Sequence, residues 1–337
     1  MEKFEHGGQV YDADGKAGDW LDFSANINPL GLSEKVRAAL AENLAGVVNY
    51  PDPAAVELKA AICARYAVKP ENLVLLNGAA EFFYLYLNAT RPRRVVIPVP
   101  SFSEYERAAR AAGADVEYFY LKAEKKFALD VEKIPAADCV ILGRPNNPTG
   151  TLPTLDEIQA LAEKSCVLVD ESFIDFLPVE SARRLVSEKI LVVQSLTKIF
   201  AIPGLRLGFA VVEEKLAARL NLAKDVWNVN FLAQKAGVAA LADEEYLAET
   251  LSWLAAEREF FLTRLKKLRG VEVVGGAANF VLVRLERAPE VLEELRRRKI
   301  LVRSCANFAG LDERFLRVAV RSRAENLRLL ENLEAIL

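Results

Sequence analysis

Residues 195–208 read SLTKIFAIPGLRLG and place one lysine between a hydroxyl group and an arginine. Ser195 lies three residues before Lys198, and Arg206 lies eight residues after it. The apolar run at 190–193 predicts a strand that leads into this stretch, and the Pro-Gly pair that follows the lysine predicts a break. A lysine that forms a Schiff base with an aldehyde needs this setting, because burial and a neighbouring cation both disfavour its ammonium form. Alone, the stretch is about equally compatible with a surface lysine in a strand-to-turn connection.

Two further motifs lie upstream of this lysine, and each contains or follows an apolar run. Residues 144–150 read RPNNPTG and come directly after the run CVIL, whereas residues 166–173 read CVLVDESF. Each has an ordinary structural explanation, since Asn-Pro pairs form turns and an aspartate after a strand can cap a helix. Three such motifs, in this order and each at a predicted strand end, are improbable as a coincidence.

Together the three motifs resemble those of the fold-type-I pyridoxal-phosphate enzymes, the class I/II aminotransferase superfamily. The resemblance implies that Lys198 holds pyridoxal 5'-phosphate and that Asn147 reaches the ring oxygen of this cofactor. It also implies that Asp170 pairs with the ring nitrogen, where an acid keeps the nitrogen protonated and makes the ring an electron sink. Lys198 and Asp170 are therefore the expected catalytic residues.

The same resemblance assigns the other cofactor contacts. The segment NGAAE at 77–81 lies between a predicted strand and a predicted helix, where exposed backbone amides favour a phosphate. Relatives carry a hydroxyl at the position of Ala80, so here the amides would act without it. Phe102 matches an aromatic that stacks on the ring, with a core phenylalanine as the alternative, and Phe173 stands where aminotransferases commonly have a tyrosine. The expected cofactor-binding residues are Tyr50, Gly78, Ala79, Ala80, Phe102, Asn147, Asp170, Phe173, Ser195, Lys198 and Arg206.

Motifs at the two ends of the chain narrow the resemblance to one family. The segments HGG at 6–8, LDFSANINPLG at 21–31 and RSCANFAG at the start of 303–321 resemble those of the L-threonine-O-3-phosphate decarboxylases. The implied reaction converts L-threonine O-3-phosphate to (R)-1-aminopropan-2-yl phosphate and carbon dioxide, in the synthesis of the cobalamin nucleotide loop. The alternative is transamination like that of the histidinol-phosphate aminotransferases, which share the middle motifs.

Position by position, the resemblance also implies a set of substrate contacts. Phosphothreonine carries a phosphate and a carboxylate, and planar guanidinium groups bind both oxyanions bidentately. The expected substrate-binding residues are His6, Gly7, Asn26, Asn147, Arg303 and Arg317. The neighbouring Arg321 and Arg323 are expected to be solvated surface groups. Tyr50 matches a tyrosine that reaches the cofactor phosphate from the neighbouring subunit, which implies a homodimer with composite sites.

Alternating strand and helix patterns predict an α/β protein. Seven predicted strands between residues 73 and 212 indicate a mostly parallel, seven-stranded sheet between helices, as in fold-type-I enzymes. We expect an N-terminal arm at 1–32 that contributes to the active site, a large cofactor-binding domain at 33–230 and a smaller α+β domain at 231–337.

Composition limits the partners. Over 337 residues, 44 basic and 47 acidic side chains nearly balance and no basic block stands out, which argues against nucleic acid. The single histidine excludes a multi-histidine metal site, and no metal is expected. Four cysteines without a C-x-x-C pair indicate reduced thiols and a cytoplasmic protein. No apolar run approaches membrane-spanning length, so no membrane partner is expected. The partners that the resemblance implies are a small phosphorylated amino acid and a second subunit.

Overall fold

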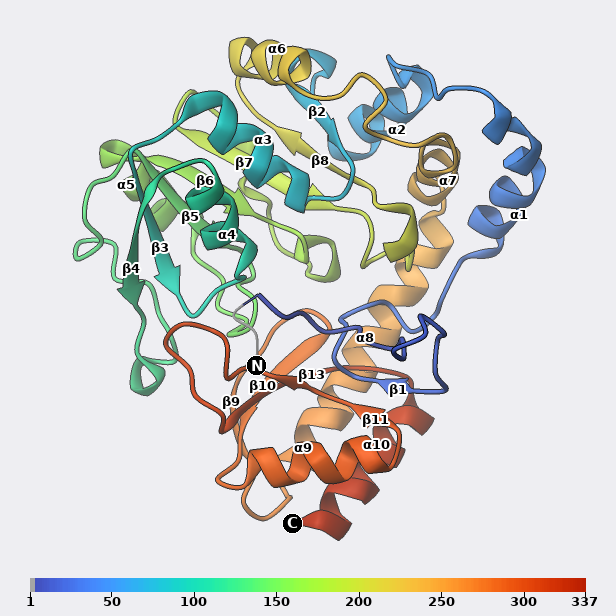
Figure 1. The fold of residues 1–337 in the computed structure, drawn as a ribbon, viewed down its shortest axis with the longest axis vertical. Helices are drawn as coiled ribbons and strands as arrows, with labels where there is room; N and C mark the ends of the chain where they lie inside the picture. Colours follow the sequence, from blue (N-terminus) through green and yellow to red (C-terminus); the bar gives the residue numbers. More distant parts are fainter. Residues whose placement is uncertain (1–3) are drawn as a thin grey trace.

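A computed structural model describes residues 4–337, and a seven-stranded sheet forms its centre (Figure 1). Its strands are β2 (Leu73–Leu76), β3 (Arg94–Val99), β4 (Asp115–Tyr120), β5 (Cys139–Gly143), β6 (Cys166–Asp170), β7 (Ile190–Ser195) and β8 (Gly208–Val211). They lie in the order β2-β8-β7-β6-β5-β3-β4. Only β8 is antiparallel to its neighbours, β2 and β7, so the expected mostly parallel sheet is confirmed.

Both faces of the inner part of this sheet are buried, which explains why β5, β6 and β7 are mostly apolar without alternation, whereas the edge strand β4 contains polar, exposed positions. Successive side chains of β5 point to opposite layers: Cys139 and Ile141 pack on one side, Val140 and Leu142 on the other. The first layer is formed by α3 (Ala80–Thr90), α4 (Glu104–Ala111) and α6 (Glu214–Ala223). The second contains α5 (Leu155–Lys164), which starts at a capping box between Thr154 and Glu157.

A third group of helices lies beside β2 and β8. It contains α1 (Glu34–Asn43), α2 (Val56–Tyr66) and α7 (Phe231–Leu241), and α7 packs against the other two. Ser33 caps α1, as predicted, by accepting a hydrogen bond from the backbone of Val36. The 22-residue α8 (Glu244–Leu265) then runs from this group into the C-terminal part of the molecule (Figure 1).

The C-terminal part is α+β, as expected. Its antiparallel sheet has the order β12 (Arg303–Ser304), β13 (Phe315–Ala319), β10 (Phe280–Arg284) and β9 (Glu272–Gly275), with α9 (Ala288–Arg297) and α10 (Arg323–Ile336) beside it. One apolar cluster continues from Phe209 in the large sheet to Phe280 and Leu329 in this part. Because the core is continuous, the division at 32 and 230 into arm, large and small domains stays a prediction.

Short 3₁₀ helices occupy several connections: η1 (Leu44–Val48), η2 (Pro70–Asn72), η3 (Ala123–Lys125), η4 (Ile174–Phe176), η5 (Ala182–Leu185) and η6 (Pro203–Leu205). Within residues 4–337, no helix is both long enough and apolar enough to cross a membrane.

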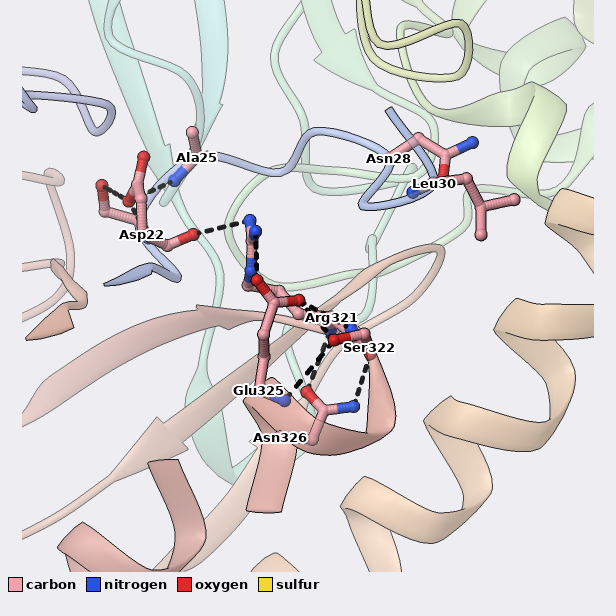
Figure 2. Close-up of polar contacts among 9 residues, drawn as sticks. Asp22, Ala25, Asn28, Leu30, Arg321, Ser322, Glu325 and Asn326 are labelled. Atoms are coloured by element: carbon pink, nitrogen blue, oxygen red, sulfur yellow. Dashed lines mark hydrogen bonds and ion pairs between the residues drawn. The ribbon is translucent and has the colours of Figure 1, made fainter. Parts of the chain in front are cut away.

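The N-terminal arm is held against the C-terminal part. Its strand β1 (Leu21–Asp22) pairs in parallel with β11 (Ile300–Leu301). Arg321 donates one hydrogen bond to the carbonyl of Asp22 at 3.0 Å and another to Glu325 at 2.6 Å (Figure 2). The expectation that Arg321 is a solvated surface group is therefore wrong: its side chain is 21% exposed and joins the arm to the start of α10. Arg323 stays half exposed and pairs with Glu257 on α8.

Replacing Arg321 should loosen the arm. Arg321→Met keeps the side-chain stem but leaves the Asp22 carbonyl and the Glu325 carboxylate without these donors, so the free energy of unfolding should fall by roughly 1–2 kcal/mol. Urea denaturation measures the loss, and hydrogen exchange of residues 21–25 localises it. Arg297→Met, which removes an exposed ion pair on α9, is the matched control and should change both little. Equal effects of the two substitutions would contradict an anchoring role.

Candidate active site

The carboxyl ends of β5, β6 and β7 bring the three sequence motifs together. Because the strands are parallel, these ends meet at one edge of the sheet, where open α/β sheets bind ligands. An open cavity of about 290 Å³ lies there. Its walls include thirteen of the predicted residues: His6, Gly7, Asn26, Ala79, Ala80, Phe102, Asn147, Asp170, Phe173, Lys198, Arg206, Arg303 and Arg317.

Three predicted residues do not line this cavity. Ser195 is buried behind it and contacts Lys198, and Gly78 lies against Arg206. Tyr50 is on the surface, 77% exposed, and stacks on Trp227 with 4.2 Å between ring centroids. A role for Tyr50 therefore depends on a second subunit.

The surroundings of Lys198 favour the neutral form of its amine. Its Nζ donates a hydrogen bond to Ser195 Oγ at 3.0 Å. Burial, with help from Arg206 and Arg317, lowers the pKa of Lys198 to about 8, although Asp170 acts in the opposite direction. At pH 7 roughly a tenth of such amines are neutral, against fewer than about one in a thousand for an ordinary lysine.

The backbone at Lys198 is fixed by the arm. The amide of Asn28 donates to the Lys198 carbonyl at 3.1 Å, and the Asn28 side chain donates to Ile199 O at 2.9 Å and Thr250 Oγ1 at 2.8 Å. Asn28 thus ties together the arm, the lysine turn and α8. The sequence motif contained Asn28, but nothing local indicated this role.

Asp170 ends β6 with its carboxylate held by neutral groups. Tyr105 donates to Oδ2 at 2.7 Å and the backbone of Ser172 donates to Oδ1 at 2.9 Å. Among the described residues, no lysine, arginine or histidine forms an ion pair with it. A buried carboxylate of this kind can receive a cationic nitrogen from a ligand. Tyr105 lies in the helix predicted at 103–112 and was missed, because no local motif marked it as a partner of Asp170.

The start of α3 forms an anion site with Arg206. Gly78 has a φ of 79°, and a Cβ there would lie 2.3 Å from Arg206 Nη2, so only glycine permits this approach. Ala79 and Ala80 follow at the N-terminus of the helix, where free backbone amides favour a phosphate. Arg206 itself has a φ of 59°, a strained conformation of the kind found at functional sites.

Arg303 and Arg317 are direct cross-strand partners on β12 and β13, and each is 6% exposed. Arg317 donates to Asn147 Oδ1 at 2.6 Å and to the Ser24 carbonyl at 2.5 Å, while its Nε has no partner. Burial lowers the pKa of Arg317 to about 10 and also lowers that of Arg303. Within residues 4–337 neither guanidinium pairs with a carboxylate, so two buried cations on the cavity wall lack an anionic partner.

The arm completes the cavity. Both side-chain amide atoms of Asn26 are buried without a hydrogen-bond partner in the described part of the chain, which is costly unless a ligand supplies one. A Cβ on Gly7 would lie 2.2 Å from the Ser24 carbonyl, so the arm can pass this close only as glycine. His6 Nε2 lies 2.8 Å from Glu104 Oε1, and its ring centroid lies 5.4 Å from that of Phe102.

Known proteins share this fold and these motifs. The family model for aminotransferase class I and II matches residues 18–333. The chain is 38% identical to the threonine-phosphate decarboxylase of Salmonella typhimurium, over 98% of this chain and 96% of that protein. Two solved structures are also similar, and each similarity covers 93% of this chain and 98% of the other chain. The histidinol-phosphate aminotransferase of Clostridium acetobutylicum has a TM-score of 0.87 and 32% sequence identity. The L-threonine-O-3-phosphate decarboxylase of Porphyromonas gingivalis has a TM-score of 0.83 and 28% sequence identity.

The fold is that of a fold-type-I enzyme. The chain belongs to the aminotransferase class I and II family, which confirms the resemblance stated from the sequence.

The charges around Lys198 generate a prediction for its reactivity. In cofactor-free protein, reaction of Lys198 with an aldehyde should rise with pH through a midpoint of about 8, because only the neutral amine attacks. Since Asp170 raises the pKa of Lys198 and Arg206 lowers it, Asp170→Asn should lower the midpoint and Arg206→Gln should raise it. Reductive methylation with peptide mass spectrometry measures each midpoint. Shifts in the same direction in both variants would rule out this electrostatic explanation.

Proposed function

We propose that the protein is a pyridoxal-phosphate-dependent lyase that converts L-threonine O-3-phosphate to (R)-1-aminopropan-2-yl phosphate and carbon dioxide. The observation that carries this proposal is the pair of buried arginines on the cavity wall that also contains Lys198, neither of which pairs with a carboxylate within residues 4–337. Identity of 38% to a threonine-phosphate decarboxylase over nearly the whole chain supports the same substrate. The product would serve the cobalamin nucleotide loop, the pathway that the sequence resemblance implies.

The residues of the cavity fit pyridoxal 5'-phosphate. Lys198 would hold the cofactor's aldehyde carbon, and the buried carboxylate of Asp170, which forms no ion pair with the described residues, would pair with its ring nitrogen. When bound, the cofactor supplies an electron sink for the electron pair left on the substrate's α-carbon. The ring would contact Phe102, Phe173 and Asn147, and the phosphate would be bound by Gly78, Ala79, Ala80, Ser195 and Arg206.

Substrate orientation decides the reaction. Phosphothreonine carries about three negative charges near neutral pH, and His6, Gly7, Asn26, Arg303 and Arg317 lie where they can bind them. Arg303 and Arg317 would select the reaction by the substrate bond that they align for cleavage. Alignment of the bond from Cα to the carboxylate would favour loss of carbon dioxide, whereas alignment of the Cα–H bond would favour transamination. The amine of Lys198, hydrogen-bonded to Ser195, would then carry the proton that is returned to Cα.

A histidinol-phosphate aminotransferase is the second candidate, favoured by the backbone similarity to the Clostridium acetobutylicum enzyme. Phe173 supports the lyase instead. It lines the cavity, packs edge-on against Phe280 with 5.2 Å between ring centroids, and has no hydroxyl to offer a ring oxygen.

A homodimer is the proposed active unit. Several apolar side chains are exposed in η1, in the segment that follows it, and beside Trp227, on which Tyr50 stacks. They are Leu44, Val47, Val48, Tyr50, Val56, Val226 and Trp227. Exposed apolar groups in such number support an interaction surface, and we propose that Tyr50 contributes from it to the partner's cofactor phosphate. A cytoplasmic location stays a prediction that rests on four free cysteines.

The reaction type is tested with phosphothreonine and no keto acid. The holoenzyme should release carbon dioxide and aminopropanol phosphate in equal amounts, detected by a coupled carbon dioxide assay and mass spectrometry. Lys198→Ala should abolish both. Amine transfer that occurs only with an added keto acid would instead identify the second candidate.

Removal of one arginine that is expected to bind the substrate should strongly reduce stabilisation of the transition state. Arg317→Gln loses charge-assisted hydrogen bonds at a buried site, so kcat/KM for phosphothreonine should fall by roughly a hundredfold or more. Arg303→Gln should act in the same direction. Arg314→Gln is the control, because Arg314 is 38% exposed, pairs with Asp312 and lies outside the cavity wall. A similar loss in the control variant would remove the assignment.

A further inference from the structure

The single histidine of the chain, His6, lines the cavity and contacts the side chain of Glu104 on α4. His6 Nε2 lies 2.8 Å from Oε1 of Glu104, the first residue of α4. The Glu104 side chain is only 9% exposed, and its other oxygen accepts a hydrogen bond from Tyr84 at 2.7 Å. Arg107 approaches the same carboxylate at 3.4 Å. Glu104 was not identified from the sequence.

This contact defines which ring nitrogen faces a ligand. Burial acts to raise the pKa of Glu104, but the hydrogen bonds from His6 and Tyr84 outweigh it and the pKa is lowered. An ionised carboxylate can only accept hydrogen bonds, so Nε2 of His6 carries the hydrogen of this pair. Nδ1 is then the ring atom left for a ligand in the cavity that His6 lines.

The backbone around His6 is fixed without Glu104. Arg303 and Asn307 both donate to the Glu5 carbonyl, at 2.6 and 3.0 Å. The amide of Gly8 donates to Ser24 Oγ at 2.7 Å. The arm therefore has its own attachments on both sides of His6, and what Glu104 adds is the orientation of the imidazole ring.

We propose that Glu104 is a positioning residue that orients His6 so that, with a hydrogen on both ring nitrogens, Nε2–H donates to Glu104 and Nδ1–H donates to an anionic group of the substrate. The identity of that substrate rests on the proposed function. Carboxylates that accept from one ring nitrogen hold histidine rings in a fixed orientation at other binding sites as well. Arg303 and Arg317 would bind the same substrate from the neighbouring cavity wall.

A double-mutant cycle on the holoenzyme tests the coupling. Glu104→Ala should raise KM for phosphothreonine roughly tenfold with a smaller change in kcat, because uniform binding is lost. His6→Ala should have a similar effect, and the double variant should be no worse than either alone. Glu104→Gln keeps an acceptor oxygen and should retain most of the affinity. Arg110→Ala, which removes a half-exposed arginine from its ion pair with Glu106 on the same helix, is the control and should leave KM within about twofold.

Additive effects in the double variant would overturn the proposal, since Glu104 would then act without His6. So would a KM that Glu104→Ala leaves unchanged. Thermal midpoint and cofactor affinity, measured on each variant, separate a folding defect from lost positioning.

Isotope-labelled histidine gives a readout that does not depend on turnover, because the chain contains one histidine. Its ring signal should shift on addition of phosphothreonine in wild type and shift less in Glu104→Ala. Aminopropanol phosphate and L-threonine, as separate probes, distinguish the phosphate from the carboxylate as the bound group. No response to any of the three ligands would overturn the proposal, whereas a response without decarboxylation would overturn only the proposed function.

Discussion

The parallel register of β5, β6 and β7 is the constraint on which the site depends. Gly143 pairs with Asp170, and Asp170 pairs with Val193, so the turn that carries Asn147, the acid and the lysine segment leave the sheet at one edge. Side chains alternate between two helical layers along these strands, and a slip by one residue would exchange them. The apolar packing of both faces therefore also places the polar groups of the site.

The cavity that results is rich in positive charge. Lys198, Arg206, Arg303 and Arg317 line it, with Asp170 as the carboxylate nearest the lysine. Burial lowers the pKa of three of these cations, which means that the folded protein disfavours their charges until an anion arrives. A phosphate-bearing cofactor and a substrate with two anionic groups would supply that compensation. Burial of these unpaired charges lowers the stability of the free protein, and binding of an anionic ligand would offset that loss.

Much of the fold could be predicted because its signals are local. The apolar runs of all seven strands and the cap at Ser33 depend on neighbouring residues, and the structure confirms them. Contacts between distant residues could not be predicted in this way. The surface role expected for Arg321 was wrong because its partner, the Asp22 carbonyl, lies 299 residues away. Tyr105 and Glu104 were missed because their hydrogen-bond partners, Asp170 and His6, belong to other elements.

By itself, the sequence determined the positions of the strands along the chain, the residue types at their carboxyl ends and the family, because apolar periodicity and short motifs can be recognised in local windows. Only the tertiary structure decided which polar side chains meet: Arg303 beside Arg317, Tyr105 on Asp170, and His6 on Glu104. A hydrogen bond requires two groups to approach within about 3 Å, and that separation is set by how whole elements pack.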